Sequence, residues 1–504
     1  SLFMRQRAGG AGVFSRWSDR VGSCLDGAMK PWLWCFLMAG LAFFVIPVRG
    51  ASPPSDRPNF ILVYCDNLGN GDVQCFHPEA RQRTPRLNRM AQEGLRLTSL
   101  YSASGVCTPS RASLMTGCYP RRVNLQRSDT GAVLQPVATK GLNPEEVTIA
   151  EVLRQRGYAT GIIGKWHLGD QPDFLPTRQG FDMFFGIPYS DDMTRDKKPD
   201  VWPELPLMRN EKVLEAPVDL DLITKRYTAE AVQFLETHRE GPFFLYLPHA
   251  MPGSTKDPYA SPAFKGKSAN GHWGDSIEEL DWSMGEILDA LKRLGLDENT
   301  LVVWTSDNGA PLRNPPQGSN APYKGYGYNT SEGAMRMPGI VRWPGRVPPG
   351  TTSTALCTMM DWLPTFAHLA GAGLPAKVID GHDLVQVLLD PGRTGTPYDD
   401  KGFFYYQGDQ LQAVRSGVWK LYLPLPNKLV NIGGKSSPAP AQLFDVVHDV
   451  GETEDVSSTH SDIVTRLTSL AAEARSELGD LDLPGTGQRP AGRTSTATAR
   501  RLQK

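Results

Sequence analysis

The chain has few cysteines, and they are scattered. Its 504 residues include seven: Cys24, Cys35, Cys65, Cys75, Cys107, Cys118 and Cys357. This number is too small for a scaffold held together by disulfides. No two of them form a Cys-x-x-Cys pair, which argues against zinc-ribbon and thioredoxin-type sites. Because seven is odd, at least one thiol has no partner within the chain.

The chain also lacks an excess of either charge. It has 53 Lys and Arg against 54 Asp and Glu, a formal net charge of −1. Proteins whose main partner is a nucleic acid normally carry a basic surplus, so this balance argues against that class. The 40% of hydrophobic and 21% of charged residues are typical of a globular protein. There is no internal repeat.

Long hydrophobic runs are missing except for one near the N-terminus. Residues 31–48 are almost wholly apolar, follow Lys30 and end close to the small residues 50–52. This order is typical of a secretory signal, although 18 apolar residues also reach the short limit for a membrane anchor. No basic cluster follows, which favours the signal. We expect residues 1–52 to be an extension with a signal peptide, the protein to be secreted or periplasmic, and membrane contact only if this segment stays uncleaved.

Apolar runs alternate with helical patterns from residue 59 onward. Strands are expected at 59–64, 158–163, 242–247 and 300–305, and helices at 84–97, 148–157, 224–238 and 276–294. This alternation predicts an α/β fold with a doubly wound, mostly parallel sheet covered on both faces.

The pattern changes near residue 400. Short strands follow one another there, and a helical pattern occupies residues 460–476. We expect a main domain at 56–395, a small antiparallel sheet with a helix at 396–482, and a disordered Gly/Pro/Thr/Arg-rich tail at 483–504.

Polar residues follow the predicted strands. These are Asp66-Asn67, Lys165-Trp166-His167, His249 and Asp307-Asn308. In open α/β sheets, ligands bind at the carboxyl ends of the strands. The four groups are therefore expected to converge on one edge of the sheet.

Residues 105–117, Gly-Val-Cys-Thr-Pro-Ser-Arg-Ala-Ser-Leu-Met-Thr-Gly, resemble the sulfatase signature C-x-P-S-R-x-x-x-x-T-G. The resemblance implies that a maturation enzyme oxidises Cys107 to formylglycine, whose hydrated aldehyde is the nucleophile. One hydroxyl of that diol attacks sulfur and the other expels sulfate, which a plain Cys or Ser could not do. The alternative is a buried structural cysteine in a turn.

Two turns resemble the metal-binding turns of the same family. Residues 66–69 read Asp-Asn-Leu-Gly where the family usually shows D-D-x-G, and Asp307-Asn308-Gly309 matches the second turn. The resemblance implies that Asp66, Asn67, Asp307, Asn308 and the modified Cys107 bind Ca²⁺, with Mg²⁺ as an alternative; oxygen ligands suit both ions. Asn67 keeps an oxygen ligand but removes one negative charge.

Residues 164–169, Gly-Lys-Trp-His-Leu-Gly, resemble another family motif. The resemblance implies that Lys165 binds the sulfate and the diol, and that His167 takes a proton when the diol collapses. It also implies that Arg111, one helical turn after Cys107, anchors a diol oxygen. Lys324 resembles the lysine that contacts the sulfate and the leaving oxygen, although its gap to Glu332 is longer than usual.

The turn at His249 departs from the pattern. Related sulfatases often read L-P-H-x-M-P-H, where the second His contacts sulfate and protonates the leaving oxygen. Residues 247–253 read Leu-Pro-His-Ala-Met-Pro-Gly, so Gly253 takes that position. His249 and the nearby His272 are the candidates for the role, and the alternative is that either histidine is structural.

The resemblance covers roughly residues 57–480 and implies an alkaline phosphatase-like fold. It implies hydrolysis of a sulfate monoester, an aryl or carbohydrate sulfate, to an alcohol or phenol and sulfate. The expected partners are a sulfated small molecule or glycan and the formylglycine-generating maturation enzyme. Two alternatives remain open: a phosphonate or phosphodiester hydrolase of the same superfamily, and a catalytically impaired binding protein, which Asn67 and Gly253 motivate.

Overall fold

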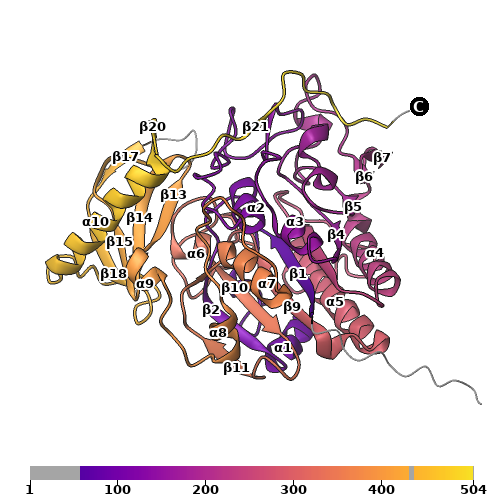
Figure 1. The fold of residues 1–504 in the computed structure, drawn as a ribbon, viewed down its shortest axis with the longest axis horizontal. Coiled ribbons are helices and arrows are strands. Elements are labelled where there is room, and N and C mark those ends of the chain that lie inside the picture. Colours follow the sequence, from indigo (N-terminus) through magenta and orange to yellow (C-terminus); the bar gives the residue numbers. More distant parts are fainter. Residues whose placement is uncertain (1–56, 431–435, 503–504) are drawn as a thin grey trace, which may run out of the picture. The chain divides into compact units, whose positions relative to one another are not determined.

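The computed structural model describes residues 57–430 and 436–502 (Figure 1). The expected N-terminal extension and signal peptide, residues 1–52, lie outside the described residues. None of the helices in these two ranges combines the length and the apolar character needed to cross a bilayer.

One large sheet organises the main domain. Its order is β11-β2-β10-β9-β1-β8-β4-β5-β6-β7, with β12 also paired to β2. The central strands β9, β1, β8, β4 and β5 are parallel, and β10, β6 and β7 add antiparallel pairs. The strands are β1 (Asn59–Asp66), β2 (Leu95–Tyr101), β4 (Ala159–Ile163), β5 (Met183–Gly186), β6 (Leu207–Arg209), β7 (Lys212–Glu215), β8 (Phe243–Pro252), β9 (Thr300–Ser306), β10 (Arg336–Arg342), β11 (Thr351–Ser353) and β12 (Cys357–Thr358).

Helices cover both faces of this sheet, as predicted (Figure 1). Successive side chains of a strand point to opposite faces, so Phe60 and Leu62 of β1 enter one core while Ile61 and Val63 enter the other. The first core contains α2 (Cys107–Thr116), α3 (Ile149–Arg154), α7 (Trp362–Ala370) and α8 (Val385–Leu389). The second contains α1 (Pro85–Gln92), α4 (Ile223–Thr237) and α5 (Gly271–Leu294). Burial on both faces explains why β1 reads as a continuous apolar run.

The helix expected at 84–97 is shorter in the structure. It ends at Gln92, and Leu95 already begins β2. A Cβ on Gly94 would lie 2.2 Å from the backbone oxygen of Val341, so the chain passes directly against β10 at this point. Pairing with β10 therefore takes residues 95–97 into the sheet.

The C-terminal region forms a second, antiparallel sheet. Its order is β13 (Phe403–Gln407), β14 (Gln410–Ser416), β15 (Trp419–Tyr422) and β18 (Gln442–Asp445), and α10 (Ser461–Leu478) packs against it (Figure 1). The expected antiparallel sheet with a helix is thus present. Shorter elements in this half are α6 (Glu332–Met335), α9 (Tyr398–Lys401), β16 (Leu425–Leu429), β17 (Ser436–Ala439), β19 (Gly479–Asp480) and β20 (Leu483–Pro484).

Residues 483–502 differ from the disordered tail expected there. β21 (Gly492–Arg493) pairs with β3 (Lys140–Gly141) of the main domain. The Arg489 guanidinium donates to both carboxylate oxygens of Glu146, each at 2.8 Å. Because polar contacts hold this segment, its low hydrophobicity gave no sign of its order.

Candidate active site

The turns after β1 and β9 lie side by side. Cys65 at the end of β1 is in register with Ser306 at the end of β9, so the turns at 66–67 and 307–308 meet. The backbone N–H of Asn67 donates a hydrogen bond to Asp307 Oδ1 at 3.0 Å. Asn67 has a φ of 59°, a left-handed conformation that Asn and Asp adopt more readily than most residues. The convergence of these two turns, expected from the sequence, is present.

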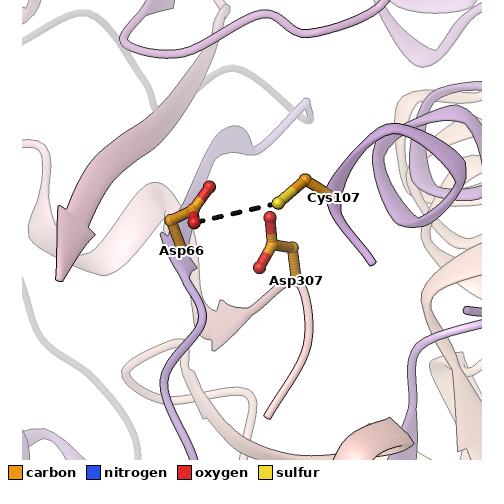
Figure 2. A group of neighbouring side chains, drawn as sticks. All are labelled: Asp66, Cys107 and Asp307. Atoms are coloured by element: carbon orange, nitrogen blue, oxygen red, sulfur yellow. Dashed lines mark hydrogen bonds between the residues drawn. The ribbon is translucent and has the colours of Figure 1, made fainter. Parts of the chain in front are cut away.

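Cys107 is the first residue of α2 and points at these turns (Figure 2). Its Sγ lies 3.8 Å from Asp66 Oδ1 and 3.9 Å from Asn67 Oδ1. Sγ and one carboxylate oxygen each of Asp66 and Asp307 lie within 4.8 Å of one another. The Cys107 side chain is only 4% exposed. Burial, and then the Asp307 and Asp66 charges, raise the pKa of the Cys107 thiol well above its usual value.

Two buried cations balance the two carboxylates. Arg111 donates from Nη2 to Asp66 Oδ2 at 2.9 Å and to Asp307 Oδ2 at 2.8 Å, and from Nη1 to the Lys165 carbonyl at 2.9 Å. Lys165, just beyond β4, donates from Nζ to Asp66 Oδ2. Burial alone would lower the pKa of Lys165, but Asp66 and Cys107 raise it above its usual value. The two carboxylates and two cations therefore sum to zero formal charge.

The oxygen atoms of the two turns suit a hard cation. Asn308 donates from Nδ2 to Asn67 Oδ1 at 2.6 Å, while its own Oδ1 is buried without a hydrogen-bond partner. A buried polar atom without a partner is costly, and coordination of a cation would satisfy it. Carboxylate and amide oxygens are the ligands that Ca²⁺ and Mg²⁺ prefer. The residues present fit such an ion.

His167 is a neutral base near this group. Its Nε2 lies 2.9 Å from the Leu134 carbonyl, which can only accept, so Nε2 carries the proton. Its Nδ1 is buried without a partner and has a free lone pair. Burial, and then the charges of Lys165 and Arg111, lower the pKa of His167 well below its usual value, which keeps the ring neutral.

His249 and Lys324 are not brought to this group by the structure. Positions 243, 245, 247 and 249 of β8 share the face covered by α4 and α5, so the His249 ring packs near Tyr227 and its Nε2 lies 3.4 Å from Ser283 Oγ. Lys324 Nζ donates to the Glu452 carbonyl at 3.1 Å in the C-terminal region.

Sequence reasoning missed three hydroxyl groups on another side of the site. Ser254 Oγ accepts from Asn67 Nδ2 at 3.1 Å and lies 3.5 Å from Ser190 Oγ. Ser190 Oγ in turn accepts from Lys165 Nζ at 3.1 Å. The Tyr328 hydroxyl lies close to Ser254, whose side chain acts to lower the pKa of Tyr328. The only signals in the sequence were the two departures from the family pattern, Gly253 and the long 324–332 segment.

The structure explains why a glycine occupies position 253. Its φ is 80°, and a Cβ there would lie 2.7 Å from both the Ala250 carbonyl oxygen and Asp191 Oδ2. The Asp191 carboxylate accepts hydrogen bonds from the amides of Ser254 and Thr255 at 3.0–3.2 Å. The turn is therefore packed so closely that an imidazole at residue 253 would not fit without a rearrangement.

Comparisons of sequence and of structure both match this chain to sulfatases. The family model described as Sulfatase matches residues 58–372. The chain is 33% identical to mouse steryl-sulfatase, covering 89% of this chain and 87% of that one. It is 38% identical to dog N-acetylgalactosamine-6-sulfatase, covering 74% and 73%. A solved sulfatase structure from Pseudoalteromonas sp. superposes with a TM-score of 0.74 at 26% identity, covering 85% of this chain and 92% of that one.

Proposed function

Because this chain belongs to the sulfatase family and hydrolyses sulfate esters, we propose that it does so with a formylglycine made from Cys107. The observation that carries the proposal is the position of Cys107. It begins α2 and faces Asp66 and Asp307; Arg111 contacts both carboxylates and Lys165 contacts Asp66. An anionic ester next to this residue would lie close to two buried cations.

The proposed cation is Ca²⁺, with Mg²⁺ as the alternative. Asp66, Asn67, Asp307 and Asn308 would hold it, and the oxygen at position 107 would complete the ligand set. When bound, the ion would polarise the sulfate oxygens, and the hydrated aldehyde would provide two hydroxyl groups on one carbon. A divalent ion would change the formal charge of this group from zero to +2, which favours binding of a sulfate monoester.

The other side chains have roles that follow from their contacts. We assign sulfate binding to Lys165 and Arg111, because both keep their positive charge while buried. His167 would accept a proton at Nδ1, since Nε2 is engaged with Leu134 and the ring is neutral.

The proposed substrate is an aryl or carbohydrate sulfate, and the proposed second partner is a formylglycine-generating maturation enzyme. Two relatives, a steryl-sulfatase and an N-acetylgalactosamine-6-sulfatase, support a ring-bearing sulfate monoester as the substrate. Export to the periplasm or the exterior is proposed from the apolar run at 31–48.

Mass spectrometry of the peptide that contains Cys107, combined with turnover of 4-nitrophenyl sulfate, tests this proposal. We expect a peptide lighter than the thiol form, and a Cys107→Ala variant at least about a thousandfold less active. Cys75→Ala is the matched control, because Cys75 is a free thiol outside the site. An unmodified Cys107 in a fully active protein would refute the formylglycine. Faster turnover of bis(4-nitrophenyl) phosphate would instead favour the phosphodiesterase alternative.

A further inference from the structure

The two buried cations of the site, Arg111 and Lys165, already form ion pairs with the carboxylates beside Cys107. Arg111 and Lys165 are both 0% exposed and bind Asp66, so neither is free to follow an oxygen that departs toward solvent. Two other candidates for that task, His249 and Lys324, make contacts elsewhere. These contacts favour a donor from another segment.

Residues 327–328 form a wall of the site. The Tyr328 amide donates to the Gly105 carbonyl at 3.0 Å, two residues before Cys107. A Cβ on Gly327 would lie 2.3 Å from the Gly309 oxygen and 3.4 Å from Asn308 Nδ2. The segment therefore passes between the start of α2 and the turn after β9. Tyr328 has a φ of 75°, which a bulky residue rarely adopts, so its position is held by these surrounding contacts.

The Tyr328 side chain reaches across the site to the opposite turn. Its hydroxyl lies close to Ser254, whose Oγ also contacts Asn67 Nδ2. A tyrosine phenol, with an ordinary pKa of about 10, is neutral near pH 7 and can donate a hydrogen bond. Arg313 donates to the Gly253 carbonyl at 3.4 Å and adds a positive charge on this side.

We propose that Tyr328 donates a hydrogen bond to the oxygen that leaves with the alcohol or phenol. The inference rests on the proposed function, because it assumes a sulfate ester bound at residue 107. When the sulfur–oxygen bond of the ester breaks, its electron pair stays on the leaving oxygen. The Tyr328 hydroxyl stabilises that charge as it develops, and a proton from water then completes the product.

The dependence of the rate on the leaving group tests this role. We compare kcat/KM for ring-substituted phenyl sulfates, from 4-nitrophenyl to 4-methoxyphenyl, in the full chain and in Tyr328→Phe. A good leaving group needs little stabilisation, so we expect a loss below about threefold for 4-nitrophenyl sulfate and about a hundredfold for 4-methoxyphenyl sulfate. Tyr326→Phe, two residues away on the same segment, is the matched control and should keep the wild-type dependence.

A second measurement separates this role from ground-state binding. In a Cys107→Ala background, calorimetry should show that Tyr328→Phe weakens binding of 4-methoxyphenyl sulfate by less than about threefold, because the charge on oxygen develops only during bond cleavage. An equal loss on all esters, or no loss on any, would overturn the inference and leave the proposed function standing. A wild-type protein with confirmed formylglycine that turns over none of these esters would overturn both.

Discussion

Asn67 influences the charge of the proposed cation site. With Asn at this position, Asp66 and Asp307 offset Arg111 and Lys165, and the group is formally neutral. An Asp would add a third carboxylate beside Asn308, whose buried oxygen has no partner. The proposed site should therefore bind a divalent ion less tightly than it would with Asp at position 67.

Replacing Asn67 with Asp should tighten calcium binding by about tenfold, or about 1.4 kcal/mol. The backbone tolerates the change, because Asp also adopts the left-handed conformation at a φ of 59°. Isothermal titration calorimetry with calcium measures the effect. Asn124→Asp is the control, since Asn124 is exposed and has a similar φ of 54°. Unchanged or weaker calcium binding by Asn67→Asp would exclude Asn67 from the ligand set.

His249 should make the fold sensitive to acid. Burial lowers the pKa of His249 to about 3, against 6.5 for an ordinary histidine. Between these two values the unfolded state binds one more proton, so the free energy of unfolding falls as the pH falls through this window, by about 1.4 kcal/mol per pH unit. His249→Gln should reduce that slope.

Denaturant unfolding at pH 7, 6 and 5 measures this contribution. The exposed His448, replaced by Gln, is the control and should keep the wild-type slope. If His249→Gln unfolds with the same pH dependence as the wild type, His249 is not the neutral buried group inferred from its contacts with Tyr227 and Ser283.

At the scale of elements, the close approach of three strand ends fixes the course of the chain into Lys165. Gly164 follows β4 with a φ of 141°, and a Cβ there would lie 1.9 Å from the Pro248 oxygen of β8. A Cβ on Gly186, at the end of β5, would lie 1.8 Å from the Gly164 oxygen. Any side chain at Gly164 must push these strands apart.

Gly164→Ala should therefore lower the free energy of unfolding by more than about 2 kcal/mol and kcat/KM by at least about tenfold, since Lys165 would shift. Gly241→Ala, just before β8, is the matched control, because a Cβ there meets nothing within 4 Å. Denaturant unfolding and steady-state kinetics give the two values. Equal stability of the two variants would show that the strands can move apart at little cost.

The elements that sequence analysis predicted well are those whose pattern is local. β1 and β9 read as apolar runs because both of their faces are buried, and the polar turns that follow them had to meet at one edge. The position of Cys107 could be predicted because its motif is short and contiguous. The end of α1 could not, since pairing with β10, far along the chain, decides it.

The positions of the residues that sequence analysis misplaced or missed depend on contacts between segments that are distant in the chain. The face of β8 that His249 occupies depends on the register of a strand whose end the sequence did not define. The courses of Lys324 and Tyr328 depend on contacts with Glu452 and Gly105, which no periodicity in residues 324–332 reveals.

At the scale of the main domain as a whole, the last segment of the described chain stabilises a distant part of it. The Arg489–Glu146 pair is largely buried, with side-chain exposures of 16% and 3%. The neighbouring pair of Arg493 and Asp129 is about half exposed. Both ion pairs connect residues 489–493 to the main domain, but one is buried and the other is half exposed.

Arg489→Ala should lower the free energy of unfolding by about 3 kcal/mol, because it leaves the buried Glu146 carboxylate with only the more distant Lys377 Nζ, at 3.8 Å, as a charged partner. Arg493→Ala, the matched control, should lose less than about 1 kcal/mol. Denaturant unfolding of both variants measures the difference. Similar small losses would mean that this segment contributes little to stability.

The pairing of β21 with β3 has a consequence for biosynthesis. Residues 492–493 leave the ribosome long after Cys107, by an interval on the order of tens of seconds at about 5–20 residues per second. Until then the native fold described here cannot be complete. In that fold Cys107 is 4% exposed, so an enzyme that modifies it must act during this interval. The yield of active protein would then depend on a competition between modification and folding, and slower folding would increase the fraction of chains that are modified.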